Sequence, residues 1–230
     1  MSYNYSTLPA KDNVNRFSFS IQIDDKLYFR KGKMIAYYGS LSFQDMGSNL
    51  LDMVLQEAFN SPLYAFDYAV VSGKGKLILA DNYNDVTAID IDGQSITIKA
   101  ENLLAFQTGL ELQQSILSGY LTLKGTGSFI VSSSGPIHLI NPPVRVDPQA
   151  LVGWIDMPSP SYYYDMNLKS LFGFTSGEEK QVDFYGNSEG VILMQSSEDP
   201  LNSNPVYKNL MFQDDIARLK ANGFGIIQAK

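Results

Sequence analysis

Val144-Arg-Val-Asp-Pro-Gln-Ala-Leu-Val-Gly-Trp154 is the stretch that decides the fold of this chain. Its alternating valines predict a short strand, its proline marks a turn, and Leu-Val-Gly-Trp predicts the start of a second strand. The stretch ends on Trp154, the only tryptophan of the chain. A large aromatic side chain beside a glycine indicates a ring that fills a core where two backbones approach closely.

The same pattern occurs twice more, in residues 27–37 and 96–106. In each copy the aromatic residue follows the first apolar residue by ten positions, as 27 to 37, 96 to 106 and 144 to 154 show. A second motif, a glycine turn followed by an apolar strand, occurs at residues 73–80 and 125–132, with a looser copy at 186–195. Self-similarity of this kind predicts three tandem β-repeats.

The order of the two motifs suggests how the repeats are completed. We predict one closed structural unit over residues 1–230, with repeat 1 at about 16–65, repeat 2 at about 66–117 and repeat 3 at about 118–181. Residues 182–196 are expected to pair with residues 17–43, completing repeat 1 and closing a ring. Residues 197–230 are expected to form a loop and a C-terminal helix.

One or two minor α-helices are expected among the strands. Apolar residues at helical spacing predict a helix over residues 48–59, which Pro62 ends. Residues 213–221 carry acidic side chains in the first turn and basic ones in the last, which favours a second helix. Residues 1–15 are polar and are predicted to form a loosely held tail.

Composition excludes several classes of function. The net charge of −7 gives an acidic surface that repels phosphate backbones, so no nucleic-acid partner is expected. The chain has no cysteine, which excludes disulfides, thiolate nucleophiles and cysteine-bound zinc. No secretory signal and no apolar run of about 20 residues is found, so a cytoplasmic protein without membrane insertion is expected.

Candidate catalytic and binding residues are few. His138 is the only histidine, and a triad with Ser132–Ser134 and Asp147 lacks any nucleophile elbow, so a solvent-facing strand histidine is the better interpretation. The glycine motifs lead into strands and lack the helix N-terminus of a phosphate site. Four carboxylates are spaced too widely for a calcium loop: Asp81, Asp85, Asp90 and Asp92. We predict no catalytic, cofactor-binding or metal-binding residues, no cofactor and no enzymatic activity.

Three segments resemble the third-repeat signature of the family called altered inheritance of mitochondria protein twenty-four. They are Val-Asp-x5-Val-Gly-Trp (146–154), Leu-Lys-Ser-Leu-Phe-Gly (168–173) and Phe-Tyr-Gly…Val-Ile-Leu-Met-Gln-Ser (184–196). The resemblance covers roughly residues 15–200. It implies three tandem domains, each a short double-stranded β-helix or β-sandwich similar to the tryptophan RNA-binding attenuator protein, arranged as a pseudo-threefold trefoil. It implies no established enzymatic activity.

The chain departs from the family pattern in two places. It has Phe174-Thr-Ser-Gly-Glu-Glu179 where the family has a Gly-Gly-Glu-Gly run, and its last glycine turn is widened by Asn187-Ser-Glu189. The expected function is a non-enzymatic binding or scaffold protein that acts through protein contacts or self-association as a homo-oligomer, because exposed strand edges seek partners. The alternative is a small-ligand-binding protein that uses clefts between the β-repeats. Tyr162–Tyr164 forms either an exposed partner patch or a partly buried contact.

Overall fold

The computed structural model describes an all-β protein, over residues 8–45, 67–115, 119–156, 161–163, 181–185 and 190–197. Within these residues every helix or strand element is a strand, which confirms the predicted fold class. In the same ranges, no helix is long and apolar enough to cross a membrane. The helices predicted at 48–59 and 213–221 lie outside the described residues.

The first strand group is built around its last strand. The group comprises β1 (Lys11–Asn15), β2 (Ser18–Ile23), β3 (Lys26–Arg30), β4 (Met34–Asp45) and β5 (Tyr68–Ala80). β5 pairs antiparallel with β2, β3 and β4, so it holds the group together. The predicted alternation in β2 places Phe19, Ile21 and Ile23 in the core. Residues 1–15 were expected to form a loose tail, but residues 11–15 form β1. The backbone of β1 pairs with β2, although its side chains are exposed.

The second strand group repeats this plan with longer strands. It comprises β6 (Asp85–Lys99), β7 (Leu103–Gln107), β8 (Leu110–Gln114) and β9 (Tyr120–Ser133). β9 takes the central place and pairs antiparallel with β6, β7 and β8. Its apolar residues, with those of its neighbours, form a core in which Phe106 and Phe129 are fully buried.

The third strand group has a similar pairing pattern, but it is built from six shorter strands. It comprises β10 (Ile137–Ile140), β11 (Val144–Val146), β12 (Leu151–Ile155), β13 (Ser161–Tyr163), β14 (Gln181–Phe184) and β15 (Val191–Gln195). β15 pairs with β10 and β12, and β14 pairs with β11 and β13. The group has a core of its own around Trp154, Phe184 and Ile192.

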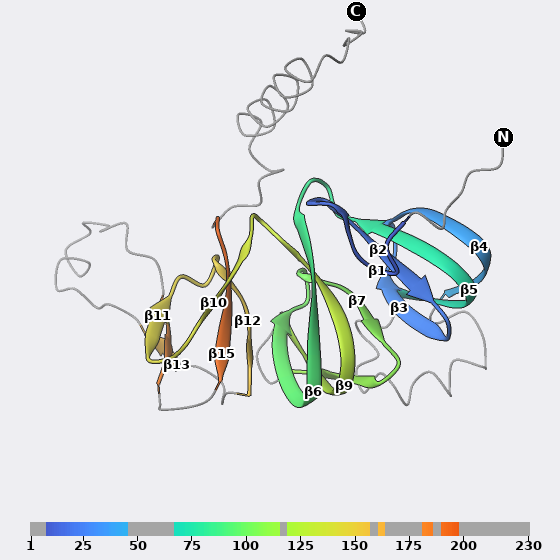
Figure 1. The fold of residues 1–230 in the computed structure, drawn as a ribbon. Helices are drawn as coiled ribbons and strands as arrows, with labels where there is room; N and C mark the ends of the chain where they lie inside the picture. Colours follow the sequence, from blue (N-terminus) through green and yellow to red (C-terminus); the bar gives the residue numbers. More distant parts are fainter. Residues whose placement is uncertain are drawn as a thin grey trace, which may run out of the picture.

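The three groups are joined by strand pairing. β3 of the first group pairs with β7 of the second, and β6 of the second pairs with β12 of the third. The resulting sheet runs in the order β1-β2-β5-β3-β7-β9-β6-β12-β15-β10. Figure 1 shows the groups side by side in chain order, with β4 at one end of the row and β11 at the other.

The last strands complete the third group, so the predicted pairing of residues 182–196 with residues 17–43 is wrong. Every described partner of β14 and β15 lies in β10 to β13. Val182, Phe184 and Ile192 pack with Trp154 in the local core, and pairing with nearby strands closes shorter loops at a lower entropy cost. Each strand–turn–strand unit is therefore completed by the glycine-motif strand that follows it.

The glycine motifs also differ from the prediction. They lie inside β5 and β9 and do not reverse the chain. Gly73 and Gly125 have φ angles of 114° and 121°, and residues other than glycine rarely adopt such backbone angles. A Cβ atom on Gly73 would lie 2.3 Å from the carbonyl oxygen of Ser40 in β4. The motif therefore permits the close approach of two strands where one of them bends.

Two of the three aligned aromatic residues fill a core as predicted. Phe106 is 0% exposed and Trp154 is 2% exposed. The Trp154 ring contacts Tyr120 and Phe184 at centroid distances of 5.2 and 5.5 Å. Tyr37, the first of the series, is 48% exposed, so for this residue the core prediction is wrong.

Candidate functional site

A buried polar cluster lies where the strand groups meet. The carboxylate of Asp81, 7% exposed, accepts hydrogen bonds from Lys33 Nζ at 2.5 Å and from Ser132 Oγ at 2.6 Å. Asn84 Nδ2 donates to the same Ser132 Oγ at 3.1 Å. Ser132 belongs to β9 and Lys33 precedes β4, so the cluster links the first and second groups. Removing Lys33 would leave the buried carboxylate of Asp81 without its ion-pair partner, so this pair favours the observed meeting of the strand ends.

Asn102 extends the cluster to the third group. Its Nδ2 donates to the carbonyl oxygen of Ser132 at 2.7 Å and lies 3.5 Å from Gln195 Oε1. The same Gln195 oxygen accepts from the backbone N–H of Ser134 at 3.1 Å. Asn102 is 7% exposed, yet its Oδ1 and that of Asn84 are buried without a hydrogen-bond partner in the described part of the chain. Buried polar atoms of this kind call for an explanation.

The two amides line a pocket of about 250 Å³ together with Lys99, Glu101, Ser134, Gln149 and Gln195. Lys99 Nζ donates to the carbonyl oxygen of Pro148 at 2.6 Å, and burial lowers the pKa of this ammonium group. Lys99 and Glu101 carry opposite charges, so the wall has no net charge. Neutral amide side chains of Asn84, Asn102, Gln149 and Gln195 line most of the pocket, which suits a small neutral polar molecule.

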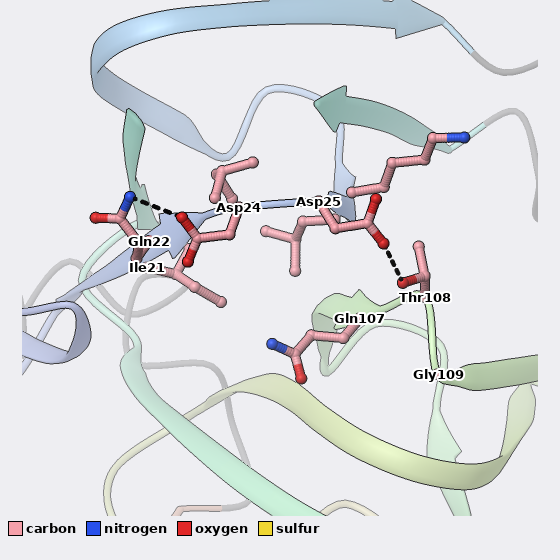
Figure 2. A pocket seen from close by; sticks show the side chains of 10 residues that line it. Ile21, Gln22, Asp24, Asp25, Gln107, Thr108 and Gly109 are labelled. Carbon is pink, nitrogen blue, oxygen red and sulfur yellow. Dashed lines mark hydrogen bonds between the residues drawn. The ribbon is translucent and has the colours of Figure 1, made fainter. Parts of the chain in front are cut away.

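A second pocket, of about 300 Å³, lies between the first and second groups (Figure 2). Figure 2 shows Asp24 and Asp25 on the β2–β3 turn, across from Gln107 and Thr108. Thr108 Oγ1 donates to Asp25 Oδ2 at 3.3 Å, and Gln22 Nε2 donates to Asp24 Oδ1 at 3.3 Å. Both aspartates are exposed. Solvated carboxylates with partners of their own favour no particular class of ligand.

His138 lies in β10 and is exposed, as predicted. Its Nε2 lies 2.9 Å from Ser196 Oγ. The hydroxyl groups considered for a triad are directed elsewhere: Ser132 donates to Asp81, and Ser133 donates to the carbonyl oxygen of Gly135. Asp147 accepts from the backbone N–H of Gln149. The described contacts therefore do not bring these residues together as a triad.

The aspartates singled out in the sequence each have a separate partner. Asp85 forms a bidentate pair with Arg16 at 2.5 and 2.8 Å. Asp90 pairs with Lys11 at 2.5 Å, and this hydrogen bond lowers the pKa of its carboxyl group. Asp92 accepts from Thr126 at 3.0 Å. In the described ranges no group of three or more histidine, cysteine or acidic residues is placed to hold a metal ion.

The edge of β4 is a feature that the sequence analysis missed. Over its whole length β4 pairs only with β5 among the described strands. Residues 34–44 contain no charged residue and no proline. Ile35 is 62% exposed and Tyr37 is 48% exposed. Proteins usually block an exposed edge with charges, prolines or a short strand, so a long uncharged edge marks a candidate interface. In the sequence, the uncharged run from 34 to 44 is the signal that could have indicated this edge.

β11, at the opposite end of the row, carries an ordered charged group. Arg145 donates to both oxygens of Asp183, from Nε at 2.5 Å and from Nη2 at 3.0 Å. Tyr185 donates to Asp183 at 2.7 Å. The hydrogen bond from Arg145 lowers the pKa of Asp183, and the hydrogen bond to Asp183 raises the pKa of Tyr185. Among the described strands β11 pairs only with β14, so its other edge is also open.

The tyrosine run is described only in part. Tyr162 and Tyr163 lie in β13, where their backbones pair with Val182 and Gln181 of β14. Tyr164 lies outside the described residues. Whether this run forms an exposed patch stays a prediction.

The comparisons with known proteins agree with this architecture. A protein from Streptococcus pyogenes, solved by X-ray crystallography, matches with a TM-score of 0.60 and 17% sequence identity. The match covers 92% of this chain and 97% of that one, which shows a shared fold. The search of curated proteins found no match. The family model described as Mitochondrial biogenesis AIM24 matches residues 14–197. Because that match spans most of the 230 residues, the chain belongs to this family.

Proposed function

We propose that the protein is a non-enzymatic scaffold that acts by self-association through the edge of β4. The observation that carries the proposal is an edge that is exposed at Ile35 and Tyr37 and has no charged residue from 34 to 44. β4 is twelve residues long and pairs with β5 on one side, and no other described strand pairs with its second edge, which can offer backbone donors and acceptors to a partner strand. Ile35 and Tyr37 add apolar surface that gains free energy when it is buried.

Two other edge strands, β1 and β10, support the choice of β4. β1 carries Lys11 and Asp12, and β10 spans only four residues. Charged or short edges are poor templates for pairing. The proposal further takes the protein to be cytoplasmic and to act without nucleic acid, membrane insertion or a cofactor.

The pseudo-threefold trefoil is part of the same proposal. The β3–β7 and β6–β12 junctions support it, because both join neighbouring groups in the same way. A third junction of this kind would need β4 to meet β11. Cross-linking separates the two ways of making that contact, within one chain or between two copies.

Introducing a lysine at Ile35 should weaken self-association at least tenfold. A charge on the edge opposes pairing with a second apolar edge, and it also removes apolar surface from the contact. Size-exclusion chromatography with light scattering, over a range of concentrations, gives the mass of the wild type and of Ile35→Lys. We expect the wild type to assemble and the variant to shift toward the monomer.

The matched control is Tyr83→Lys, because Tyr83 is similarly exposed, at 59%, but lies in the loop between β5 and β6. It should assemble as the wild type does. A wild type that stays monomeric at every concentration, or equal weakening by both substitutions, would contradict the proposal.

The second candidate function is binding of a small neutral polyhydroxy compound in the pocket around Asn102. The amide side chains of the lining favour it, because the amides of Asn84, Asn102, Gln149 and Gln195 can donate to and accept from hydroxyl groups of a ligand. The pocket volume of about 250 Å³ lies below the range of drug-sized ligands and fits a compact molecule.

Glucose and myo-inositol, added at millimolar concentrations, should raise the melting temperature of the wild type if this site binds such compounds. Asn102→Leu should abolish the shift, whereas Gln113→Leu, on β8 and outside the pocket lining, should keep it. Equal shifts in all three proteins would indicate a general solvent effect and would rule out the site.

A further inference from the structure

Lys99, the last residue of β6, has its amino group at the wall of the pocket around Asn102. Its side chain is 15% exposed. The Nζ atom donates to the backbone carbonyl oxygen of Pro148 at 2.6 Å and to that of Gln149 at 3.4 Å. Glu101 Oε1 lies 4.0 Å from the same nitrogen. Because Gln149 and Glu101 also line the pocket, a small molecule inside it comes close to this amino group.

The surroundings of this amino group differ from those of the lysines that hold strands together. Lys11 and Lys33 each form an ion pair with an aspartate at 2.5 Å, so a carboxylate engages each ammonium group directly. The short hydrogen bond of Lys99 goes to a neutral carbonyl group, and its ion pair with Glu101 spans 4.0 Å. Burial lowers the pKa of Lys99, although Glu101 and Asp147 act in the opposite direction. The neutral amine therefore forms more easily here than on a solvated lysine.

The two carbonyl oxygens also orient the neutral form of the amine. The ammonium group has three donors, so the loss of one proton leaves two N–H groups and a lone pair. The carbonyl oxygens of Pro148 and Gln149 can accept both N–H groups. The lone pair is then directed away from these two oxygens and is available to an electrophile. A desolvated lysine with an available lone pair is the arrangement that forms Schiff bases with carbonyl compounds.

We infer that Lys99 binds a small hydroxyaldehyde or hydroxyketone covalently, as a reversible Schiff base. This inference rests on the second candidate function, because the compound enters the same pocket. The neutral amide side chains of the lining can bond to its hydroxyl groups, and the volume of about 250 Å³ suits a compound of few carbon atoms. Capture of this kind involves no turnover, so it is compatible with a non-enzymatic protein.

The step balances without a further reagent. Glu101, whose side chain is 78% exposed and can turn toward the nitrogen, takes one proton from the ammonium group. The lone pair of Nζ forms a bond to the carbonyl carbon, and the C=O electron pair moves to oxygen, which receives a proton from nitrogen. Glu101 then returns its proton to this hydroxyl group, which leaves as water while the nitrogen lone pair forms the C=N bond. An ammonium group and a carbonyl compound thus give a protonated imine and one water molecule.

Reductive trapping with glyceraldehyde and sodium cyanoborohydride tests this site, because hydride converts the imine into a stable secondary amine. Peptide mass spectrometry gives the labelling rate of each lysine in the full-length protein. We expect Lys99 to be labelled about tenfold faster than Lys26 and Lys124, although these two are exposed and Lys99 is only partly exposed. In urea the three rates should become equal, because the pocket is lost.

Two substitutions assign the label. Lys99→Arg should remove the fast-labelled site, because the guanidinium group stays protonated and forms no Schiff base here. Lys124→Arg is the matched control, because Lys124 lies in β9 outside the pocket lining, and it should leave the fast labelling of Lys99 unchanged.

Two results would overturn the inference. Equal labelling of the three lysines in the folded protein would mean that Lys99 is not a covalent site. Fast labelling of Lys99 that persists in urea would mean that the folded pocket does not cause it. In either case the second candidate function stands if myo-inositol, which has no carbonyl group, raises the melting temperature of the wild type but not of Asn102→Leu. If that shift is missing as well, both are wrong.

Discussion

Replacing Trp154 with alanine should lower the free energy of unfolding by about 3 to 5 kcal/mol, the usual cost of deleting a large buried aromatic side chain. Trp154 is 2% exposed and packs against Tyr120 and Phe184, so little of the cavity left behind can collapse. Its strand also pairs with β6, which joins the second and third groups. Urea denaturation followed by tyrosine fluorescence and circular dichroism measures the change.

Tyr37→Ala is the matched control, because Tyr37 is the equivalent aromatic residue but is 48% exposed. At a protein concentration where the chain is monomeric, this substitution should cost less than about 1 kcal/mol, as surface substitutions do. A similar loss for both variants would mean that Tyr37 is as buried as Trp154, and would contradict the exposed edge of β4.

Replacing Gly73 with alanine should cost at least about 3 kcal/mol, because two unfavourable effects coincide there. The φ angle of 114° disfavours any side chain, and the new Cβ atom would lie 2.3 Å from the carbonyl oxygen of Ser40. Relief of that clash has to move β5 away from β4. Chemical denaturation gives the loss, and loss of amide protection in β4 locates it.

Gly93→Ala separates the two effects. Gly93 has a φ angle of 73°, but a Cβ atom there would meet no atom within 4 Å. This control should lose only about 1 to 2 kcal/mol, the cost of the left-handed backbone alone. If Gly73→Ala cost no more than Gly93→Ala, the close approach of β4 and β5 would not be a constraint on the fold.

The sequence predicts much of the local structure. Alternation of apolar residues predicts β2, and the spacing that ends on Trp154 predicts both a strand and a buried ring. The choice of pairing partners is different, because alternation tells which face of a strand is buried but not which strand lies beside it. For this reason the prediction that residues 182–196 pair with the first group is wrong, because they pair with their sequence neighbours.

The candidate sites are harder to predict for a similar reason. Asn102 follows an ordinary turn signal, and its hydrogen bonds to Ser132 of β9 and Gln195 of β15 place it where the second and third groups meet, which the sequence does not show. Its buried Oδ1 has no described partner. The prediction that the glycine motifs are turns is wrong for the copies in β5 and β9. Glycine allows both a turn and a bend within a strand, so the sequence alone does not separate the two. In β4 the uncharged run from 34 to 44 was visible in the sequence, but its meaning depends on the absence of a second strand partner in the described sheet.

Amide hydrogen exchange of residues 35–38 tests the central claim most directly, namely that the edge of β4, which no second described strand pairs with, pairs with another chain on self-association. In dilute solution, residues 104–107 and 152–155 should be protected, while the amides of 35–38 that do not bond to β5 exchange quickly. In concentrated solution, residues 35–38 should become protected. Exchange in residues 35–38 that is equally slow at both concentrations, or equally fast at both, would contradict the claim.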